Sequence, residues 1–540
     1  MLGLMMDYPL TIPSMLDHGN RMFPNKEIIS YMPDRSRHSY TFADLYTRSK
    51  KTMHALTSKL GVKKGDIIGT FAWNHYQHME LYFAIPGAGA ICHTINIRLS
   101  SQQTEFIINN AEDRYIFVDA TLVHLLEPIA KLLSTVEAYI LLNAPANFST
   151  TLSNCIHYEE LIADCHDDLP WAELNELDAS AMCYTSGTTG TPKGVLYSHR
   201  SACLHTLIGS LPNYLNISSA DRLLIIVPQF HVLAWGLPFA AILAGATIIM
   251  PSSQMQPESI INIIMNENVN KGSAVPTIWQ NVYSMLKKNG QTSLPLKEFL
   301  VGGAAMPPSL LEGYQKDFGI KAVHAWGMTE TSPVGTVSRL QPEDDALPDD
   351  KKIKRRSMQG QQLPFTEIRI VSEDGKICAW DGQSVGEIQI KGAWVISDYF
   401  KTASRETFTD DGWFKTGDVG AINADGYLQI TDRAKDLIKS GGEWISSVAL
   451  EVSIMAHPKV KEASVIAIPD ETWSERPLAI IVLKEETDTV TVEEMRSFLS
   501  DSFAKYQLPD QFICRAEIPK TSVGKFDKKR MRQLYAEGKL

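Results

Sequence analysis

The chain has 540 residues, more than one domain usually holds, and its 44% hydrophobic and 21% charged residues are ordinary for a globular enzyme. A formal net charge of −11 argues against a general nucleic-acid binder, which normally carries a basic excess. The seven cysteines are odd in number and never occur in C-x-x-C spacing. They predict a reducing, cytoplasmic location, with neither a disulfide framework nor a zinc site.

The first 180 residues alternate between strand-like and helix-like patterns. Buried strands are expected over residues 66–72, 115–119 and 138–142, and helices after Thr41, a candidate N-cap, and over residues 78–90. Alternation of this kind predicts a mostly parallel sheet that is covered on both faces by helices. The N-terminus has no basic segment before Asp7, so no secretory signal is expected.

Residues 184–199 form the stretch with the strongest chemical signal. An apolar run over 179–184 leads into ten residues with three glycines, four threonines, one serine, one proline and Lys193. Glycines let backbone N–H groups approach a ligand, hydroxyls donate to oxyanions, and a lysine adds charge, so the pattern predicts polyphosphate binding. It lacks the G-K-[S/T] of the common P-loop and predicts a strand–loop–strand turn, with a helix beginning near Ser198.

Residues 223–257 contain no charged side chain, and a hydropathy window could read them as a membrane span. Prolines and glycines interrupt the run, however. We therefore expect a strand over 223–227, a helix over 235–243 and a strand over 247–250, all in a buried core beside a pocket. No membrane span is predicted, while contact with a membrane surface stays open.

Two further motifs follow, each after a predicted strand. Residues 299–303 form a strand that ends in two glycines, where ligands bind in open parallel sheets. In residues 324–333, Trp326 could stack on a purine, Thr329 could bond a phosphate, and Glu330 could hold Mg²⁺.

Residues 341–362 are expected to be a solvated loop. The basic run at 351–356 could also meet CoA phosphates or anionic lipid, but its acidic neighbours largely cancel its charge.

The last third of the chain changes pattern. Short strands with Asp-Gly turns over 368–390 predict an antiparallel β subdomain, and Asp418 ends a motif whose carboxylate could accept from ribose hydroxyls. A small α/β unit follows, with helices expected over 443–457 and 492–499 and strands over 461–468 and 478–483. Lys525 lies in a loop near its end, where its ammonium could reach an anion.

Taken in order, these motifs resemble those of the adenylate-forming superfamily, which includes acyl-CoA synthetases, peptide-synthetase adenylation domains and beetle luciferases. The resemblance covers essentially the whole chain. It implies an α/β fold with a large N-terminal domain, residues 1–431, of mostly parallel sheets covered by helices. This domain includes a β subdomain at about 360–431. A hinge at 432–437, centred on Lys435, would lead to a small mobile C-terminal α+β domain, residues 438–540.

The resemblance also assigns roles to residues of this sequence. It implies catalytic roles for Lys525, Lys439 and His231, and metal ligands at Thr185 and Glu330. The implied acyl pocket contains His231, Trp235, Gly302 and Gly303. The implied CoA side contains Gly441 and Gly442. The implied ATP-binding residues are Thr185, Ser186, Gly187, Thr188, Thr189, Lys193, Gly303, Ala304, His324, Ala325, Trp326, Gly327, Met328, Thr329, Asp418, Arg433, Lys435 and Trp444.

The implied reaction has two steps, with ATP, Mg²⁺ and coenzyme A. A carboxylate attacks the α-phosphate to give an acyl-adenylate and pyrophosphate, and the CoA thiol then takes the acyl group. Peptide-synthetase domains usually carry Phe-Asp where this chain has Phe230-His231, so an amino-acid substrate is disfavoured. Trp235 resembles the gate of fatty-acyl tunnels, although ordinary aromatic core is the alternative. We expect a medium- or long-chain fatty acid, most like bacterial fatty-acyl-CoA synthetases.

Several alternatives share the same nucleotide motifs. They are a ligase for aryl or other carboxylates, an enzyme that loads an acyl-carrier protein, a luciferase-like oxygenase and, least supported, a binding protein without activity. The sequence does not give the oligomeric state, although the long-chain members that it resembles are often homodimers. Acyl chain length depends on side-chain packing that the sequence does not fix.

Overall fold

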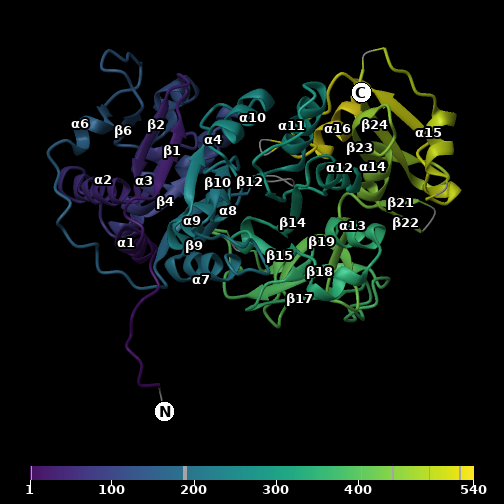
Figure 1. Ribbon diagram of the computed structural model, residues 1–540, viewed down its shortest axis with the longest axis horizontal. Coiled ribbons are helices and arrows are strands. Elements are labelled where there is room, and N and C mark those ends of the chain that lie inside the picture. The colour runs from purple at the N-terminus through teal and green to yellow at the C-terminus, as the bar shows by residue number, and fades with distance from the viewer. Residues whose placement is uncertain are drawn as a thin grey trace.

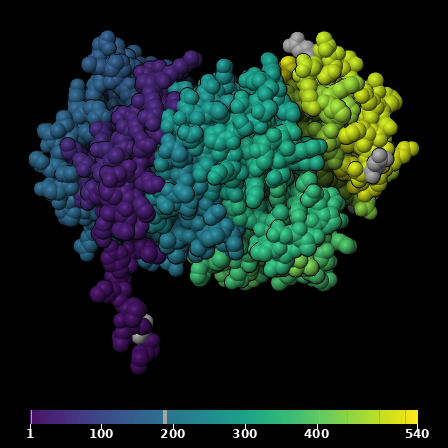
Figure 2. Space-filling view, viewed as in Figure 1, coloured from purple at the N-terminus to yellow at the C-terminus, as the bar shows by residue number. Residues whose placement is uncertain are grey.

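The computed structural model describes residues 1, 3–185, 191–402, 404–440, 443–485, 487–500, 502–521 and 524–540. Figure 1 shows a large body built from the first two thirds of the chain, a β-rich unit beneath it, and a small yellow unit at one end that contains the C-terminus. In Figure 2 the first residues project from the body as an extended tail. In the described residues, no helix is long and apolar enough to cross a membrane. The expected α/β class is confirmed.

The first sheet of the large body has seven strands in the order β7-β6-β5-β3-β4-β8-β9, all parallel except the last pair. The strands are β3 (Ile67–Phe71), β4 (Ile91–Thr94), β5 (Tyr115–Asp119), β6 (Ala138–Leu142), β7 (Cys155–His157), β8 (Ala179–Tyr184) and β9 (Gly194–Ser198). The expected strands at 66–72, 115–119 and 138–142 are confirmed. The strand–loop–strand turn is confirmed as well, since β8 and β9 pair and α7 begins at His199.

The second sheet has nine strands in the order β16-β15-β14-β13-β12-β10-β11-β1-β2, with a parallel centre and antiparallel edges. The strands are β1 (Glu27–Tyr31), β2 (Arg37–Thr41), β10 (Arg222–Ile225), β11 (Thr247–Met250), β12 (Lys271–Ala274), β13 (Glu298–Val301), β14 (Lys321–Gly327), β15 (Val334–Ser338) and β16 (Gln361–Gln362). The two glycines that follow β13 lie, as expected, at the carboxyl end of a parallel strand.

Helices cover these sheets, and most of them bury apolar side chains against the strands. They are α1 (Ile12–Met22), α2 (Phe42–His54), α3 (Tyr76–Gly87), α4 (Ser101–Ala111), α5 (Val123–Leu126), α6 (Tyr158–Ile162), α7 (His199–Gly209), α9 (Leu237–Ala244), α10 (Pro257–Asn266), α11 (Pro276–Lys288), α12 (Pro308–Phe318) and α13 (Asp349–Ser357). Thr41 caps α2 as expected: its hydroxyl accepts from the backbone N–H of Asp44, whose carboxylate accepts from the Thr41 N–H.

The last third of the chain forms two smaller sheets. An antiparallel sheet contains β17 (Thr366–Val371), β18 (Gly386–Gly392), β19 (Phe414–Ile422) and β20 (Leu428–Arg433). The second sheet contains β21 (Ile438–Ser440), β22 (Glu443–Ile445), β23 (Val460–Asp470), β24 (Ser474–Leu483) and β25 (Gln511–Cys514), with helices α14 (Ser447–Met455), α15 (Val492–Leu499) and α16 (Lys528–Ala536). The chain passes from one sheet to the other between Arg433 and Ile438.

Two expectations about local structure are wrong. Residues 341–362 are not a plain loop, because α13 occupies Asp349–Ser357 with acidic residues in its first turn and basic ones in its last, which favours the helix dipole. Arg355 of this helix pairs with Asp344 and Asp425. The helix expected over 443–457 begins only at Ser447, because its first three residues pair with β21 as β22.

A third expectation fails at Trp235, where we expected a helix to begin. Residues Val232–Trp235, named α8, lie in the left-handed region with φ between 46° and 60°, and Gly236 continues it at 71°. The right-handed helix α9 starts only at Leu237. Left-handed backbone costs about 1–2 kcal/mol for each residue with a Cβ atom, so burial of this uncharged segment must supply the compensation.

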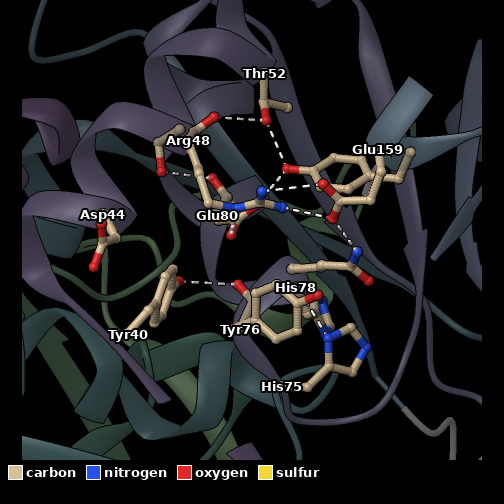
Figure 3. A network of polar contacts seen from close by, with 12 residues as sticks. Tyr40, Asp44, Arg48, Thr52, His75, Tyr76, His78, Glu80 and Glu159 are labelled. Carbon is tan, nitrogen blue, oxygen red and sulfur yellow. Dashed lines mark hydrogen bonds and ion pairs between the residues drawn. The ribbon is translucent and has the colours of Figure 1, made fainter. Parts of the chain in front are cut away.

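A buried polar network joins α2, α3 and α6 (Figure 3). Arg48 donates to Glu80 at 2.6 Å and to Glu159 at 2.7 Å, and Tyr158 donates to the second oxygen of Glu80 at 2.5 Å. The Glu80 side chain is 0% exposed. A carboxylate at this depth is tolerated because a cation and a hydroxyl satisfy it.

We therefore expect Arg48→Ala to lower the free energy of unfolding by about 3 kcal/mol, because it leaves a buried carboxylate without its cation. Urea unfolding followed by circular dichroism measures the change. Lys64→Ala is the matched control, since its partner Asp178 and its own side chain are partly exposed, and it should change stability by less than about 1 kcal/mol. Equal effects of the two variants would contradict this view of the network.

Candidate active site

The centre of the candidate site is the carboxylate of Asp418, on β19. The indole N–H of Trp326, at the end of β14, donates to its Oδ2 at 2.8 Å, and Nε of Arg433, at the end of β20, lies 2.9 Å from its Oδ1. Asp418 and Arg433 also face each other in the β19–β20 register. Three residues that the sequence singled out separately thus meet at one buried carboxylate, which is 4% exposed.

The phosphate loop and the Thr-Glu motif meet on another side of the site. At the base of the loop, the Thr185 N–H donates to the Lys193 carbonyl at 2.9 Å. This bond extends the β8–β9 pairing by one residue, to Thr185 and Lys193. Tyr399 donates to Oε1 of Glu330 at 2.6 Å, and the Lys193 ammonium lies 4.7 Å from the centre of the Tyr399 ring. Ser186, Gly187, Thr188 and Thr189 lie outside the described residues.

Lys525 reaches this group from the small C-terminal unit. A methyl group placed on Gly303 would lie 3.5 Å from Cε of Lys525, so the two residues are close neighbours. Burial lowers the pKa of Lys525 to about 8; Arg433 adds to the decrease, while Asp418 and Glu330 oppose it. Lys525 therefore lies in the same electrostatic environment as the two carboxylates.

His231 and Trp235 form the side that the resemblance assigned to the acyl group. Burial, together with the positive charges of Lys525 and Arg98, lowers the pKa of His231 to about 3. His231 is therefore neutral at pH 7. A Cβ atom at Gly302 would lie 3.4 Å from Cη2 of Trp235 and 2.9 Å from the Ala325 carbonyl, so only glycine fits between them. These residues lie near Lys525.

The wall next to Gly303 is held by His324, which is 2% exposed. Its Nε2 lies 3.2 Å from the Ala304 carbonyl and its Nδ1 lies 3.1 Å from the Ser357 carbonyl. Burial lowers the pKa of His324, while its hydrogen bonds to the Ser357 and Ala304 carbonyls oppose that decrease. Its role here is to support the Ala304 backbone.

The Thr-Glu motif itself turns tightly after β14. Its close approach to the next segment explains Gly327, because a Cβ atom there would lie 1.7 Å from the Pro333 carbonyl. The Met328 N–H donates to that carbonyl at 3.0 Å, and the Tyr197 hydroxyl donates to the Thr329 carbonyl at 2.8 Å. The motif is therefore fixed through its backbone.

The hairpin of β21 and β22 lies apart from this group. The Lys439 ammonium lies 4.1 Å from the centre of the Trp444 ring and 3.8 Å from Oε1 of Glu373, and Trp444 is 39% exposed. These contacts do not bring Lys439 or Trp444 to Asp418. Lys435 lies between β20 and β21. Gly441 and Gly442 lie outside the described residues, so their expected role stays a prediction.

Two tyrosines that contact the site were not predicted. Tyr197 lies on β9, inside the 184–199 stretch but without an assigned role, and Tyr399 lies in the connection between β18 and β19, outside every predicted motif. The sequence signal for Tyr399 was weak, because Tyr399 is a single aromatic residue in a loop. Its place depends on the pairing of Phe400 with Gly194, which sequence periodicity does not reveal.

The residues present fit a magnesium ion that is shared with phosphates. Glu330 is 6% exposed, and Tyr399 lies between its carboxylate and Lys193 of the phosphate loop. The described residues contain no group of three or more His, Cys, Asp or Glu that could hold a metal alone. Mg²⁺ is typically bound by one or two carboxylates together with substrate phosphates, which matches this donor set.

Comparison with known families gives two matches. Residues 16–400 match the family described as AMP-binding enzyme, and residues 449–525 match the AMP-binding enzyme C-terminal domain. The first match alone covers more than half of the chain.

Several known proteins are similar over nearly their whole length. The medium-chain-fatty-acid–CoA ligase of Ectopseudomonas oleovorans is 40% identical, covering 99% of this chain and 98% of its own. The long-chain-fatty-acid–CoA ligase of Thermus thermophilus is 40% identical, covering 98% and 96%. The 3-methylmercaptopropionyl-CoA ligase of Ruegeria lacuscaerulensis is 39% identical, covering 99% of each chain.

Solved structures agree on the fold. An anthranilate CoA ligase in complex with anthranoyl-AMP has a TM-score of 0.87 at 23% identity, covering 98% of this chain and 99% of its own. The o-succinylbenzoate coenzyme A synthetase of Bacillus subtilis, in complex with ATP and a magnesium ion, has a TM-score of 0.78 at 26% identity, covering 96% and 99%.

The geometry at Asp418 generates a prediction about nucleotide binding. Asp418→Asn should weaken ATP binding about tenfold or more, because a hydrogen bond to a charged acceptor contributes about 1.5–3 kcal/mol. Isothermal titration calorimetry with ATP measures the loss. Asp411→Asn, an exposed carboxylate of the same β subdomain that pairs with Arg369, is the control and should bind ATP like the wild type. Unchanged affinity in Asp418→Asn would remove this carboxylate from the nucleotide site.

Proposed function

The chain belongs to the AMP-binding enzyme family, and from this membership we propose that it joins a medium- or long-chain fatty acid to coenzyme A. As an acyl-CoA synthetase it is an AMP-forming acid–thiol ligase. The observation that carries the finer proposal is the meeting of Lys525, Asp418 and Glu330 beside the neutral His231 and Trp235. One side of this group suits a nucleotide and the other suits an uncharged acyl chain.

In the first step the substrate carboxylate is itself the nucleophile, so the protein mainly positions it and stabilises charge at the α-phosphate. We assign that stabilisation to the ammonium of Lys525. Lys193, with the hydroxyls of the phosphate loop, holds the β- and γ-phosphates that leave as pyrophosphate. Glu330 and Thr185 would hold Mg²⁺, which would supply Lewis-acid charge on the phosphates.

The nucleotide base and sugar are assigned to the neighbouring residues. Asp418 accepts from the ribose hydroxyls, and Arg433 neutralises that carboxylate and faces the nucleotide. Ala304 and the 324–326 stretch pack along the adenine, and His324 supports the Ala304 backbone. The ATP and magnesium complex of the Bacillus subtilis relative, at 26% identity, supports both ligands.

In the second step the small domain rotates about a hinge at residues 432–437. The separate position of the β21–β22 hairpin supports this assignment, because Lys439 and Trp444 are exposed while Lys525 is partly buried at the site. Rotation would withdraw Lys525 and bring the hairpin, with Gly441 and Gly442, to the CoA side. One pocket then serves two reactions through a conformational change.

The acyl assignment rests on the lining and on two relatives. A neutral imidazole at His231 offers no charge to hold the ammonium of an amino acid, and Trp235 presents an apolar face. Ligases for medium-chain and long-chain fatty acids, each 40% identical, support a fatty acid. A short thioether acid is the second candidate, favoured by the 3-methylmercaptopropionyl-CoA ligase at 39% identity.

A substrate panel tests this proposal. CoA-dependent AMP release should be measured with straight-chain acids from acetate to palmitate, with benzoate and with 3-methylmercaptopropionate. We expect the highest kcat/KM with an acid of medium or long chain. An optimum at acetate or benzoate would contradict the fatty-acid proposal, and an optimum at 3-methylmercaptopropionate would replace it. Replacement of CoA by a holo acyl-carrier protein should abolish thioester formation.

The pKa of Lys525 generates a prediction with a definite sign. Because its pKa is about 8 in the free enzyme, the charged form is present below pH 8 and is lost as the pH rises. We expect kcat/KM for ATP, measured as pyrophosphate release, to fall about tenfold per unit above pH 8, since this parameter reports groups of the free enzyme.

Two variants complete the experiment. Lys525→Arg keeps its charge over this range and should lack the alkaline decrease, while Lys525→Ala should lose pyrophosphate release by several orders of magnitude. The assignment would be wrong if Lys525→Ala released pyrophosphate at the wild-type rate, or if Lys525→Arg kept the same alkaline decrease.

A further inference from the structure

Tyr399 contacts two residues of the polyphosphate side, although no motif singles it out. Its hydroxyl donates to Oε1 of Glu330 at 2.6 Å, and the Lys193 ammonium lies 4.7 Å from its ring centre. The tyrosine is 8% exposed. Both contacts are therefore made largely away from bulk water, where hydrogen bonds and cation–π contacts are stronger than at a surface.

The backbone on both sides of Tyr399 is fixed to the same two elements. The Ile396 N–H donates to the Glu330 carbonyl at 3.0 Å, and the Phe400 N–H donates to the Gly194 carbonyl at 2.9 Å. Gly194 is the residue directly after Lys193. Residues 396–400 thus connect the Thr-Glu motif to the end of the phosphate loop through backbone hydrogen bonds. The Tyr399 side chain makes a second connection between them, through its contacts with Glu330 and Lys193.

A hydrogen bond to one carboxylate oxygen has a specific effect on a metal ligand. It fixes rotation about the last side-chain bond, so the second oxygen is presented in one direction. Outer partners of this kind are common at metal sites, and their loss lowers metal affinity about 10–100-fold. The aromatic face meanwhile limits where the Lys193 ammonium can lie, which sets its distance from Glu330.

We propose that Tyr399 is a positioning residue that orients the Glu330 carboxylate toward Mg²⁺ and holds the Lys193 ammonium beside it. The inference rests on the proposed function in one respect, that Glu330 and Lys193 face MgATP. The two parts of the Tyr399 side chain have different effects. The hydroxyl orients the metal ligand Glu330, and the ring holds the phosphate-binding Lys193.

Two substitutions separate these effects. Tyr399→Phe removes the hydroxyl and keeps the ring, and Tyr399→Leu removes both. By calorimetry on the full-length protein, Tyr399→Phe should raise the Kd of ATP about tenfold with Mg²⁺ present and leave it within twofold of wild type in EDTA. Tyr399→Leu should raise the Kd under both conditions. The Mg²⁺ concentration for half-maximal AMP release should rise in Tyr399→Phe in parallel.

Tyr427→Phe is the matched control. Tyr427 is buried, and its hydroxyl donates to a backbone carbonyl, that of Arg339, at 2.5 Å. It should bind ATP like the wild type with and without Mg²⁺. The inference is overturned if Tyr399→Phe binds MgATP like the wild type, or if it loses the same affinity in EDTA, which would indicate a packing effect. Because these titrations use neither acid nor CoA, their outcome is independent of the substrate panel.

Discussion

The paired carboxylate of Asp418 is the interaction on which the arrangement of the site depends. It ties Trp326 of the nine-stranded sheet to Arg433, the last residue of the antiparallel sheet before the chain enters the small unit. A buried carboxylate must be paired and hydrogen-bonded, so its two oxygens bring both partners to one place. The nine-stranded sheet and the antiparallel sheet are therefore held together at the point where we place the nucleotide.

Electrostatics then couples the small unit to this point. Lys525 and Arg433 are both cations near Asp418 and Glu330, and their mutual repulsion contributes to the lowered pKa of Lys525. Withdrawal of Lys525 relieves that repulsion, while arrival of a polyphosphate favours its return. The charge of the ligand can thus bias the position of a whole domain without any direct contact to the hinge.

The fold could be predicted from sequence where a local signal was sufficient. Strands at 115–119, 138–142 and 247–250 agree to the residue, because continuous apolar runs with β-branched residues have few other solutions. The α13 helix was missed because its residues are almost all charged and carry no apolar stripe; its stability comes from end charges and from Arg355 pairing across the chain.

Only part of the candidate site was predicted, again because some of its residues carry no local sequence signal. Asp418, Lys525, Glu330 and Lys193 lie in motifs, and the structure brings them together. Tyr399 was missed because its function depends on a contact between segments about 200 residues apart in the chain. The exposed position of Trp444 was also not expected, since sequence carries no information about which of two domain orientations a structure adopts.

The left-handed segment from Val232 to Trp235 has a consequence for engineering. Its four non-glycine residues are held by burial against their own backbone preference, at a cost of roughly 4–8 kcal/mol in total. At Ala234, where only a methyl group would be lost, glycine would relieve part of that strain and loosen the wall beside His231 at the same time. Thermal stability and acyl selectivity are therefore opposed at this one segment, and a search for stabilised variants would select against the shape of the pocket.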